Sequence, residues 1–324
     1  MAKDVALVLS SGGARGLAHI GAIEELEAQG FRITSVAGCS MGALIGGVYA
    51  TGKLAEFREW MKTIDKKKMM ELTDFSFSLN HVAKGTRTIG AIMEFVPDVA
   101  IEDLPIPYCA VATDWKSGRE VVFREGSLFE AIRASISLPS FYEPVQRDGM
   151  ILIDGGVTNP IPMNRVVRHE GDILVGIDVS GHDYKAQWEK QHELAERRKR
   201  SKSLSQQLLN HLIPDNLDFN YYTMLSRVSS IMIRQNSLLM AQLTNPDILV
   251  DIQMNRYGSF DYDKSEKLIA IGRKKTHEAI ATKAYILLRF VVVVPDEEGD
   301  ARESYDKFEG DDDDVLHNGN GFIS

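Results

Sequence analysis

The sequence predicts an α/β fold around a mostly parallel sheet. Through the first 180 residues, short runs of β-branched and apolar residues alternate with helical patterns, which is typical of parallel α/β sheets. Glycine-rich turns separate many of these runs. The chain of 324 residues is 44% hydrophobic and 26% charged, so it has the composition of a globular protein and the length to bury a large core.

Strands are expected where β-rich runs are bounded by turn residues. These runs are Val5–Leu9, Ile33–Ala37, Pro107–Thr113, Glu120–Phe123, Met150–Asp154 and Asp172–Val179. Helical patterns are found between them, at Leu17–Gln29, Met41–Thr51, Gly126–Ala134 and Pro162–His169. Two further segments are interpreted as a turn at 117–118 that pairs two strands and a surface loop at Glu71–Thr88.

Helical patterns dominate beyond Gly181. We expect helices at Lys185–Leu212, Tyr221–Leu243 and Lys264–Arg289, with a last strand at Ile248–Gln253. Residues 1–294 are predicted to form one domain, with a motif-bearing core over about 5–180 and helical additions over 181–294. Residues 295–324 contain eleven acidic and two basic residues, which predicts a disordered acidic tail.

Charge and cysteine content exclude several classes of function. The predicted tail accounts for the whole net charge of −9, so residues 1–294 are formally neutral. A domain without excess positive charge gives no support for nucleic-acid binding. The two cysteines, Cys39 and Cys109, favour a reducing compartment. The longest apolar run, Ala284–Val294, is too short to cross a bilayer, and no secretory signal is visible. We therefore expect a cytoplasmic protein, and one without a metal or a cofactor, because the sequence has no CxxC or HExxH cluster.

Residues 38–42 read Gly-Cys-Ser-Met-Gly, which fits the G-x-S-x-G pattern of a nucleophile elbow. The pentapeptide stands between a predicted strand and a helix of small residues, as such an elbow requires. Gly38 and Gly42 leave room for the sharp turn that exposes the hydroxyl of Ser40. The helix that follows offers free N–H groups to a developing oxyanion. Ser40 is thus the candidate nucleophile.

A second glycine-rich turn, residues 11–16 (Ser-Gly-Gly-Ala-Arg-Gly), joins the first strand to the first helix. Its backbone N–H groups can face an anion, here the oxyanion of an acyl transfer. A P-loop is excluded because Gly-Leu-Ala follows where Gly-Lys-Ser/Thr is needed. A dinucleotide site is disfavoured because Ser11 replaces its first glycine and no acidic residue closes the second strand. A plain tight turn stays open as the alternative.

The partner of the serine is better supplied by an aspartate than by a histidine. Asp154 ends an apolar strand and precedes Gly155 and Gly156, so a parallel sheet would place it at the same edge as Ser40. Burial would raise its pKa and make it a useful base. An aspartate that only orders its own turn is the alternative. His19, near the glycine-rich turn, is a candidate for a supporting role. The later histidines are interpreted as surface residues: His81, His169, His182, His192, His211, His277 and His317.

These three segments, in this order, resemble the glycine-rich loop, the nucleophile elbow and the D-G-[GA] motif of the patatin-like phospholipases. Residues 134–144, which read Ala-Ser-Ile-Ser-Leu-Pro-Ser-Phe-Tyr-Glu-Pro, are similar to the segment that precedes the aspartate motif in that family. The resemblance covers about residues 5–180. It implies a three-layer α/β/α sandwich and a dyad without histidine, in which Ser40 is the nucleophile and Asp154 the base.

The same resemblance implies an oxyanion hole and a substrate class. The oxyanion hole would be formed by the backbone of Gly12 and Gly13, with Ala14 and Arg15. The remaining motif glycines are Gly16, Gly38, Gly42, Gly155 and Gly156. Acyl lipids are the expected substrates. Two other functions stay open: a soluble esterase or thioesterase, and a regulatory partner-binding protein on the same fold.

The predicted helix at 185–212 is the candidate for peripheral membrane contact. Leucines at 204, 208, 209 and 212 fall near one helical face, beside a basic run at 197–200. The alternative is that this helix simply packs onto the rest of the predicted domain. The sequence contains no feature that predicts an oligomeric state.

Overall fold

The computed structural model describes residues 3–64, 67–68, 91, 95, 98–139, 142–181, 221–253, 257–258 and 261–292. The expected loop at Glu71–Thr88, the helix at Lys185–Leu212 and the tail at 295–324 lie outside these residues. Contacts divide the chain into two compact units, Met1–Ala281 and Thr282–Ser324. All the strands described below lie in the first unit.

Within the described residues, eight strands form one mixed sheet. Their order is β5-β6-β3-β2-β1-β7-β8, and β4 pairs with β3. The strands are β1 (Lys3–Leu9), β2 (Phe31–Cys39), β3 (Tyr108–Asp114), β4 (Glu120–Phe123), β5 (Val145–Arg147), β6 (Met150–Asp154), β7 (Ile173–Gly181) and β8 (Ile248–Gln253). Strands β3, β2, β1, β7 and β8 are parallel, as the alternating pattern predicts, whereas β4, β5 and β6 form antiparallel pairs.

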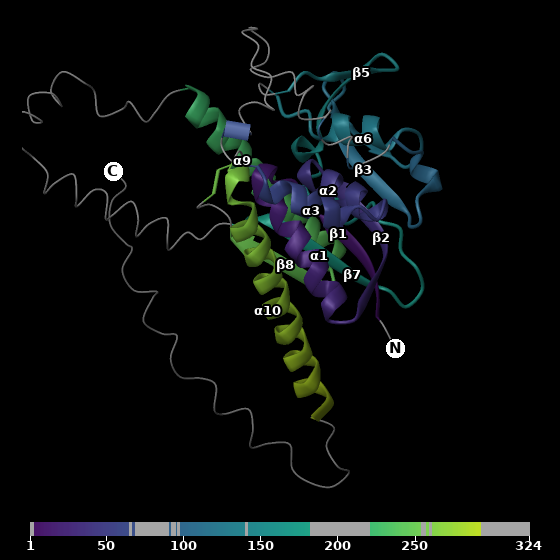
Figure 1. Cartoon of the computed structure of the whole chain (residues 1–324), viewed down its shortest axis with the longest axis vertical. Coiled ribbons are helices and arrows are strands. Elements are labelled where there is room, and N and C mark those ends of the chain that lie inside the picture. Colours follow the sequence, from purple (N-terminus) through teal and green to yellow (C-terminus); the bar gives the residue numbers. More distant parts are fainter. Residues whose placement is uncertain are drawn as a thin grey trace, which may run out of the picture. The chain divides into compact units, whose positions relative to one another are not determined.

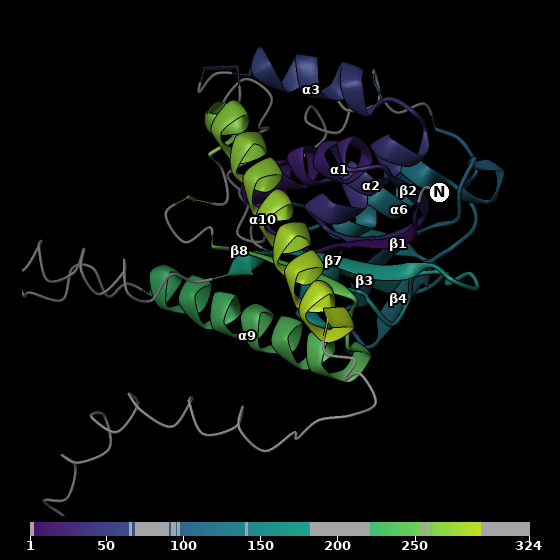
Figure 2. The same cartoon turned by 90° about the horizontal axis from the view of Figure 1, so that it is seen from below.

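Helices cover both faces of the sheet, which makes the three layers visible in Figure 2. One face carries α1 (Ala18–Ala28), α2 (Met41–Ala50) and α6 (Leu128–Ser135), and α9 (Tyr221–Thr244) covers the other. Alternate residues of β1 point to the two layers. Val5, Leu7 and Leu9 are buried under the first layer, and Ala6 and Val8 under the second. The central strands are therefore buried on both faces, as parallel strands usually are.

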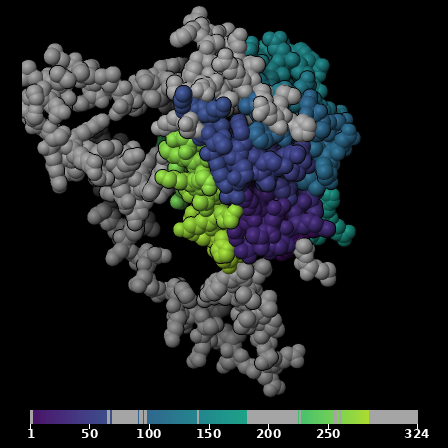
Figure 3. Space-filling model, in the orientation of Figure 1, coloured from purple at the N-terminus to yellow at the C-terminus, as the bar shows by residue number. Residues whose placement is uncertain are grey.

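Helices α1 and α10 contact each other through a pair of glycines. A Cβ atom on Gly21 of α1 would lie 1.9 Å from the carbonyl oxygen of Ile269 in α10 (Ser265–Val292), and one on Gly272 would lie 1.9 Å from that of Ala18. The two backbones therefore touch at reciprocal glycines. Figures 1 and 3 show the α10 segment, in yellow-green, lying against the purple N-terminal segment.

The structure differs from the sequence expectations in several elements. Residues 162–169 are not a helix but a turn at 163–165 followed by irregular chain, because the consecutive residues Ile161, Pro162 and Met163 are all buried and a helix would bury only one stripe. The first helix begins with a 3-10 turn at Gly13–Leu17. Helix α3 (Leu54–Lys62) and strand β5 were not expected.

Candidate active site

Ser40 stands on a strained elbow between β2 and α2. Its backbone angles are φ 53° and ψ −121°, which non-glycine residues rarely adopt and which cost on the order of 1–3 kcal/mol. Glycines make the turn possible. A Cβ atom on Gly38 would lie 2.4 Å from the Gly42 carbonyl oxygen, and one on Gly42 would lie 2.2 Å from that of Leu9. The elbow thus packs directly onto the end of β1.

Asp154 reaches Ser40 across strand β3. The Ser40 hydroxyl donates a hydrogen bond of 2.5 Å to Oδ2 of Asp154. The other carboxylate oxygen, Oδ1, accepts the N–H of Gly156 at 2.7 Å. Both dyad residues are buried, with 9% of Ser40 and 5% of Asp154 exposed. The carboxylate is therefore oriented by two donors, of which one is the candidate nucleophile.

The strand that carries Asp154 runs in a different direction from the one that the sequence predicted. The expected placement rested on a parallel strand, but β6 runs antiparallel to β3. In register, Cys39 pairs with Val111 and Asp154 pairs with Ala112. The end of β2 and the end of β6 therefore come to the same level on opposite sides of β3, although the two strands run in opposite directions.

Burial raises the pKa of Asp154 to about 6. Desolvation of the carboxylate is the largest cause, and the hydrogen bonds from Ser40 and Gly156 act in the opposite direction. A carboxylate with this pKa is ionised at neutral pH and is a stronger base than an exposed aspartate.

The glycine-rich turn at 11–16 lies against both the elbow and the aspartate turn. A Cβ atom on Gly16 would lie 2.3 Å from the Met41 side chain, and one on Gly156 would lie 3.1 Å from Oγ of Ser11. Gly13 has φ +56°, a left-handed conformation that favours glycine. In the described part of the chain, neither Gly12 nor Gly13 donates its N–H to a backbone partner. These amides are free to bind an anion.

The side chain of Arg15 is held beside the turn. Its Nε donates to the carbonyl oxygen of Gly12 at 3.0 Å. Burial lowers the pKa of Arg15, and the nearby Asp178 opposes this effect. Ala14 is buried in the turn, so its side chain does not face solvent.

None of the histidines in the described ranges takes part in the dyad. His19 is fully buried, and its Nε2 lies 2.9 Å from the carbonyl oxygen of Ser10. Desolvation lowers its pKa to about 4, so it is neutral at physiological pH and donates from Nε2 to that carbonyl. His169 bonds through its backbone to Asp172, and His277 contacts Glu25 and Gln29. His19 therefore supports the start of the glycine-rich turn.

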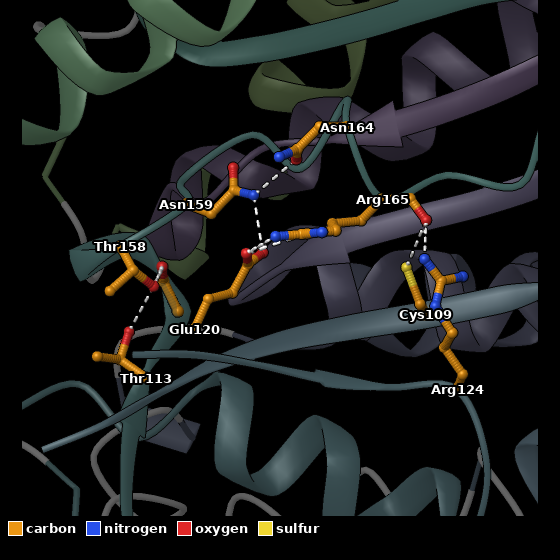
Figure 4. Close-up of polar contacts among 9 residues, drawn as sticks. Cys109, Thr113, Glu120, Arg124, Thr158, Asn159, Asn164 and Arg165 are labelled. Carbon is orange, nitrogen blue, oxygen red and sulfur yellow. Dashed lines mark hydrogen bonds and ion pairs between the residues drawn. The ribbon is translucent and has the colours of Figure 1, made fainter. Parts of the chain in front are cut away.

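A polar network that the sequence analysis missed anchors the segment after Asp154 (Figure 4). Glu120 on β4 accepts from Asn159 at 2.8 Å and forms an ion pair of 2.6 Å with Arg165. Thr113 donates to the Asp154 carbonyl oxygen at 3.1 Å. Its hydroxyl also lies 2.9 Å from that of Thr158, a contact drawn in Figure 4. The only sequence signal was the polar Thr-Asn pair inside an otherwise apolar stretch.

Comparison with known proteins places this site in a family. Residues 7–167, about half of the chain, match the model of the patatin-like phospholipase family. This region contains both Ser40 and Asp154, together with the glycine-rich turn. The chain thus belongs, through this domain, to the patatin-like phospholipases, as the three motifs predicted.

Several curated proteins share this region. An NTE family protein of Mycobacterium tuberculosis, Rv1063c, is 44% identical over 179 residues, which cover 55% of this chain and 50% of that protein. Human patatin-like phospholipase domain-containing protein 6 is 33% identical over 188 residues, which cover 56% of this chain and 14% of that protein. Neuropathy target esterase sws of Drosophila melanogaster is 32% identical over 188 residues, with 56% and 13% covered.

The match is thus confined to one region of each protein: the alignment spans half of the mycobacterial relative and a smaller share of the animal ones. Among solved structures, VipD from Legionella pneumophila covers 87% of this chain and 67% of its own, with a TM-score of 0.43 and 14% identity. In the described residues, no helix is long and apolar enough to cross a membrane, and no cluster of potential metal ligands is found.

Proposed function

We propose that this protein is a serine acyl hydrolase that cleaves carboxylic esters of acyl lipids through a dyad of Ser40 and Asp154. The observation that carries this proposal is the buried 2.5 Å hydrogen bond from the Ser40 hydroxyl to Asp154, on an elbow within a patatin-like domain. A hydroxyl that already donates to a carboxylate of raised pKa is prepared to lose its proton during attack.

The reaction takes place in two halves. The Oγ atom of Ser40 attacks the ester carbonyl carbon while its proton passes to Asp154, and the carbonyl oxygen becomes an oxyanion. The free N–H groups of Gly12 and Gly13 stabilise this charge, which is worth about 3–4 kcal/mol for each donor in related sites. The C–O bond then breaks, and the leaving alcohol takes the proton from Asp154. Water then attacks the acyl carbon while Asp154 takes its proton, the bond between that carbon and Oγ of Ser40 breaks, and Asp154 returns the proton to Oγ as the carboxylic acid leaves.

Activity should depend on the protonation state of Asp154. The base is active as a carboxylate, so we expect kcat/KM on a soluble ester to rise with pH through about 6 and then to level off. Below this pH the rate should fall about tenfold for each pH unit. The measurement is a pH–rate profile between pH 4.5 and 8.5, with melting temperatures recorded across the range to exclude unfolding. A profile that stays flat from pH 5 to 8 would contradict the assignment of the base.

Exposed apolar side chains on the turn after Asp154 and on helix α9 support lipids as the substrate. Val157, three residues after Asp154, exposes 49% of its surface. Helix α9 packs against the Gly155–Val157 turn. This helix also exposes large apolar side chains: Met224, Val228, Ile231, Met232, Leu238, Leu239 and Leu243. Such side chains favour contact with acyl chains or a lipid surface. The names of the relatives, a phospholipase and an esterase, agree with ester hydrolysis.

Val157 offers a test of lipid contact. We expect Val157→Asp to reduce hydrolysis of phospholipid vesicles about five- to tenfold, because burial of the exposed half of a valine side chain contributes about 1 kcal/mol of apolar transfer energy. Hydrolysis of a short-chain soluble ester should stay within twofold of the parent. Val157→Leu, which keeps an apolar side chain at the same half-exposed position, is the control and should change neither rate. Equal loss on both substrates, or no loss on vesicles, would remove Val157 from the lipid contact.

A substrate panel tests the proposal as a whole. The purified full chain and its Ser40→Ala variant are assayed on soluble esters, thioesters, and phospholipids in micelles and vesicles. We expect Ser40-dependent fatty-acid release, with the highest rates on aggregated lipid. Turnover of soluble esters or thioesters alone would indicate a soluble esterase or thioesterase. No turnover and no labelling of Ser40 by a serine-reactive probe would favour a regulatory binding protein. Peripheral membrane contact through 185–212 stays a separate hypothesis about residues that the structure does not describe.

A further inference from the structure

A buried serine lies at the point where the two halves of the dyad meet. Ser135 is the last residue of α6 and has no exposed surface. Its hydroxyl accepts the backbone N–H of Ser40 at 2.8 Å and donates to the carbonyl oxygen of Val111 at 2.6 Å. The direction of both bonds is fixed, because an amide N–H only donates and a carbonyl oxygen only accepts. One hydroxyl therefore ties the elbow to strand β3.

The same segment also holds Asp154. Two residues after Ser135, the carbonyl oxygen of Ser137 accepts the backbone N–H of Asp154 at 3.0 Å. The Ser137 hydroxyl is occupied elsewhere, since it donates to the Arg133 carbonyl oxygen at 2.8 Å and accepts from the Arg133 guanidinium at 2.6 Å. The backbone amides of both dyad residues are thus anchored within three consecutive residues of one segment.

Val111 connects this anchor to the aspartate turn. A Cβ atom on Gly155 would lie 2.2 Å from the Val111 carbonyl oxygen, so the turn passes directly over the atom that Ser135 holds. A shift of Ser135 would therefore move the elbow that carries Ser40. It would also release the Val111 carbonyl oxygen, against which the aspartate turn packs. The 2.5 Å contact between Ser40 and Asp154 depends on both.

The geometry points to Ser135 as a positioning residue for the Ser40–Asp154 dyad. It sets the distance between nucleophile and base by binding the Ser40 amide and the Val111 carbonyl, and it does not touch the substrate. The inference rests on the proposed function of the dyad. It also has a consequence for the oxyanion. Because the Ser40 N–H is committed to Ser135, the oxyanion must be bound by other amides, which agrees with the free N–H groups of Gly12 and Gly13.

The strained backbone of Ser40 explains why such an anchor is needed. A residue at φ 53° tends to relax unless its neighbours hold it. Without the Ser135 hydroxyl, the Ser40 N–H and the Val111 carbonyl would both lose a buried partner, and the elbow would move to satisfy them. A displacement of about 1 Å at a catalytic group can lower the rate on the order of a hundredfold.

The test compares two buried serines on the full chain. Ser135→Ala should lower kcat on a soluble ester about ten- to a hundredfold and leave KM within twofold. The rate of labelling by a fluorophosphonate should fall by the same factor. Ser35→Ala is the matched control. Ser35 is equally buried and donates to the Val167 carbonyl oxygen at 2.5 Å, but it lies five residues before Ser40 on β2. It should lower the melting temperature by a similar amount and keep kcat within twofold.

A conservative variant separates the hydroxyl from the packing. Ser135→Thr keeps the hydroxyl and should restore kcat to within about threefold of the parent. If Ser135→Ala does not fold, Ser135→Cys replaces it, because the thiol keeps the shape but bonds weakly, and kcat should still fall at least about fivefold. Three results would overturn the inference: unchanged kcat in the Ala or Cys variant, an equal loss in Ser35→Ala, or a folded Thr variant as slow as Ala. Failure of the dyad itself would be seen separately, as activity that survives Ser40→Ala.

Discussion

Ser40→Ala should reduce ester hydrolysis by at least about three orders of magnitude, to the background of the assay. The loss should be this large because Ser40 is the hydroxyl that stands on the elbow and donates to Asp154. The hydroxyls of Ser135 and Ser137, on the segment that holds the two dyad amides, already donate to backbone carbonyl oxygens. The measurement is kcat on a soluble ester and on phospholipid vesicles. The melting temperature should stay close to that of the parent, because alanine occupies the same strained turn with little change in volume.

Residual activity in Ser40→Ala would have a clear meaning. If the variant keeps a tenth or more of the parent rate and is pure, another group performs the attack. The elbow would then be a structural turn, and the proposed mechanism would be wrong.

Asp154→Asn should lower kcat by at least about two orders of magnitude, the scale of general-base catalysis. Asparagine keeps the shape of the side chain and can still accept the Gly156 N–H, but its amide cannot take the proton of Ser40. The same variant should react much more slowly with a fluorophosphonate at Ser40. The measurements are steady-state kinetics and the labelling rate, both at pH 8.

Stability gives the Asp154→Asn experiment an internal control. The folded-state pKa of Asp154, about 6, lies above the ordinary value of 3.8, so the buried carboxylate costs stability once the pH rises above this interval. At pH 8 the asparagine variant should therefore melt at or above the temperature of the parent. A variant that is stable and fully active would return Asp154 to a turn-ordering role. If substitution of a histidine in the described ranges reduced activity as much as Ser40→Ala does, without unfolding the protein, the active site would be a triad that includes this histidine.

The parts of the fold that could be predicted depend on local signals. Strand β1, the elbow and the aspartate turn were predicted because apolar runs that end in glycines leave few alternatives to a strand followed by a sharp turn. Strand β8 and the long helix α9 follow from their apolar patterns in the same way. The candidate nucleophile and base could be selected for the same reason, since both stand at strand ends.

The parts that could not be predicted depend on long-range pairing. The antiparallel direction of β6 is set by its hairpin with β5 and its pairing with β3, which the motif Asp-Gly-Gly does not encode. Residues 162–169 were predicted as a helix because local pattern does not reveal that the segment lies flat across a sheet face. Ser135 and Glu120 have no individual signal, because their importance comes from partners 95 and 39 residues away.

The most direct test of the account is to locate the acyl group during turnover. The full chain is mixed with a soluble ester, quenched in acid within the first turnovers, digested and analysed by peptide mass spectrometry. The account predicts an acyl group, at no more than one per chain, on the peptide that contains Ser40, and none in the Ser40→Ala variant. An acyl group on a different residue, or rapid product release from a chain that never becomes acylated at Ser40, would contradict the central claim.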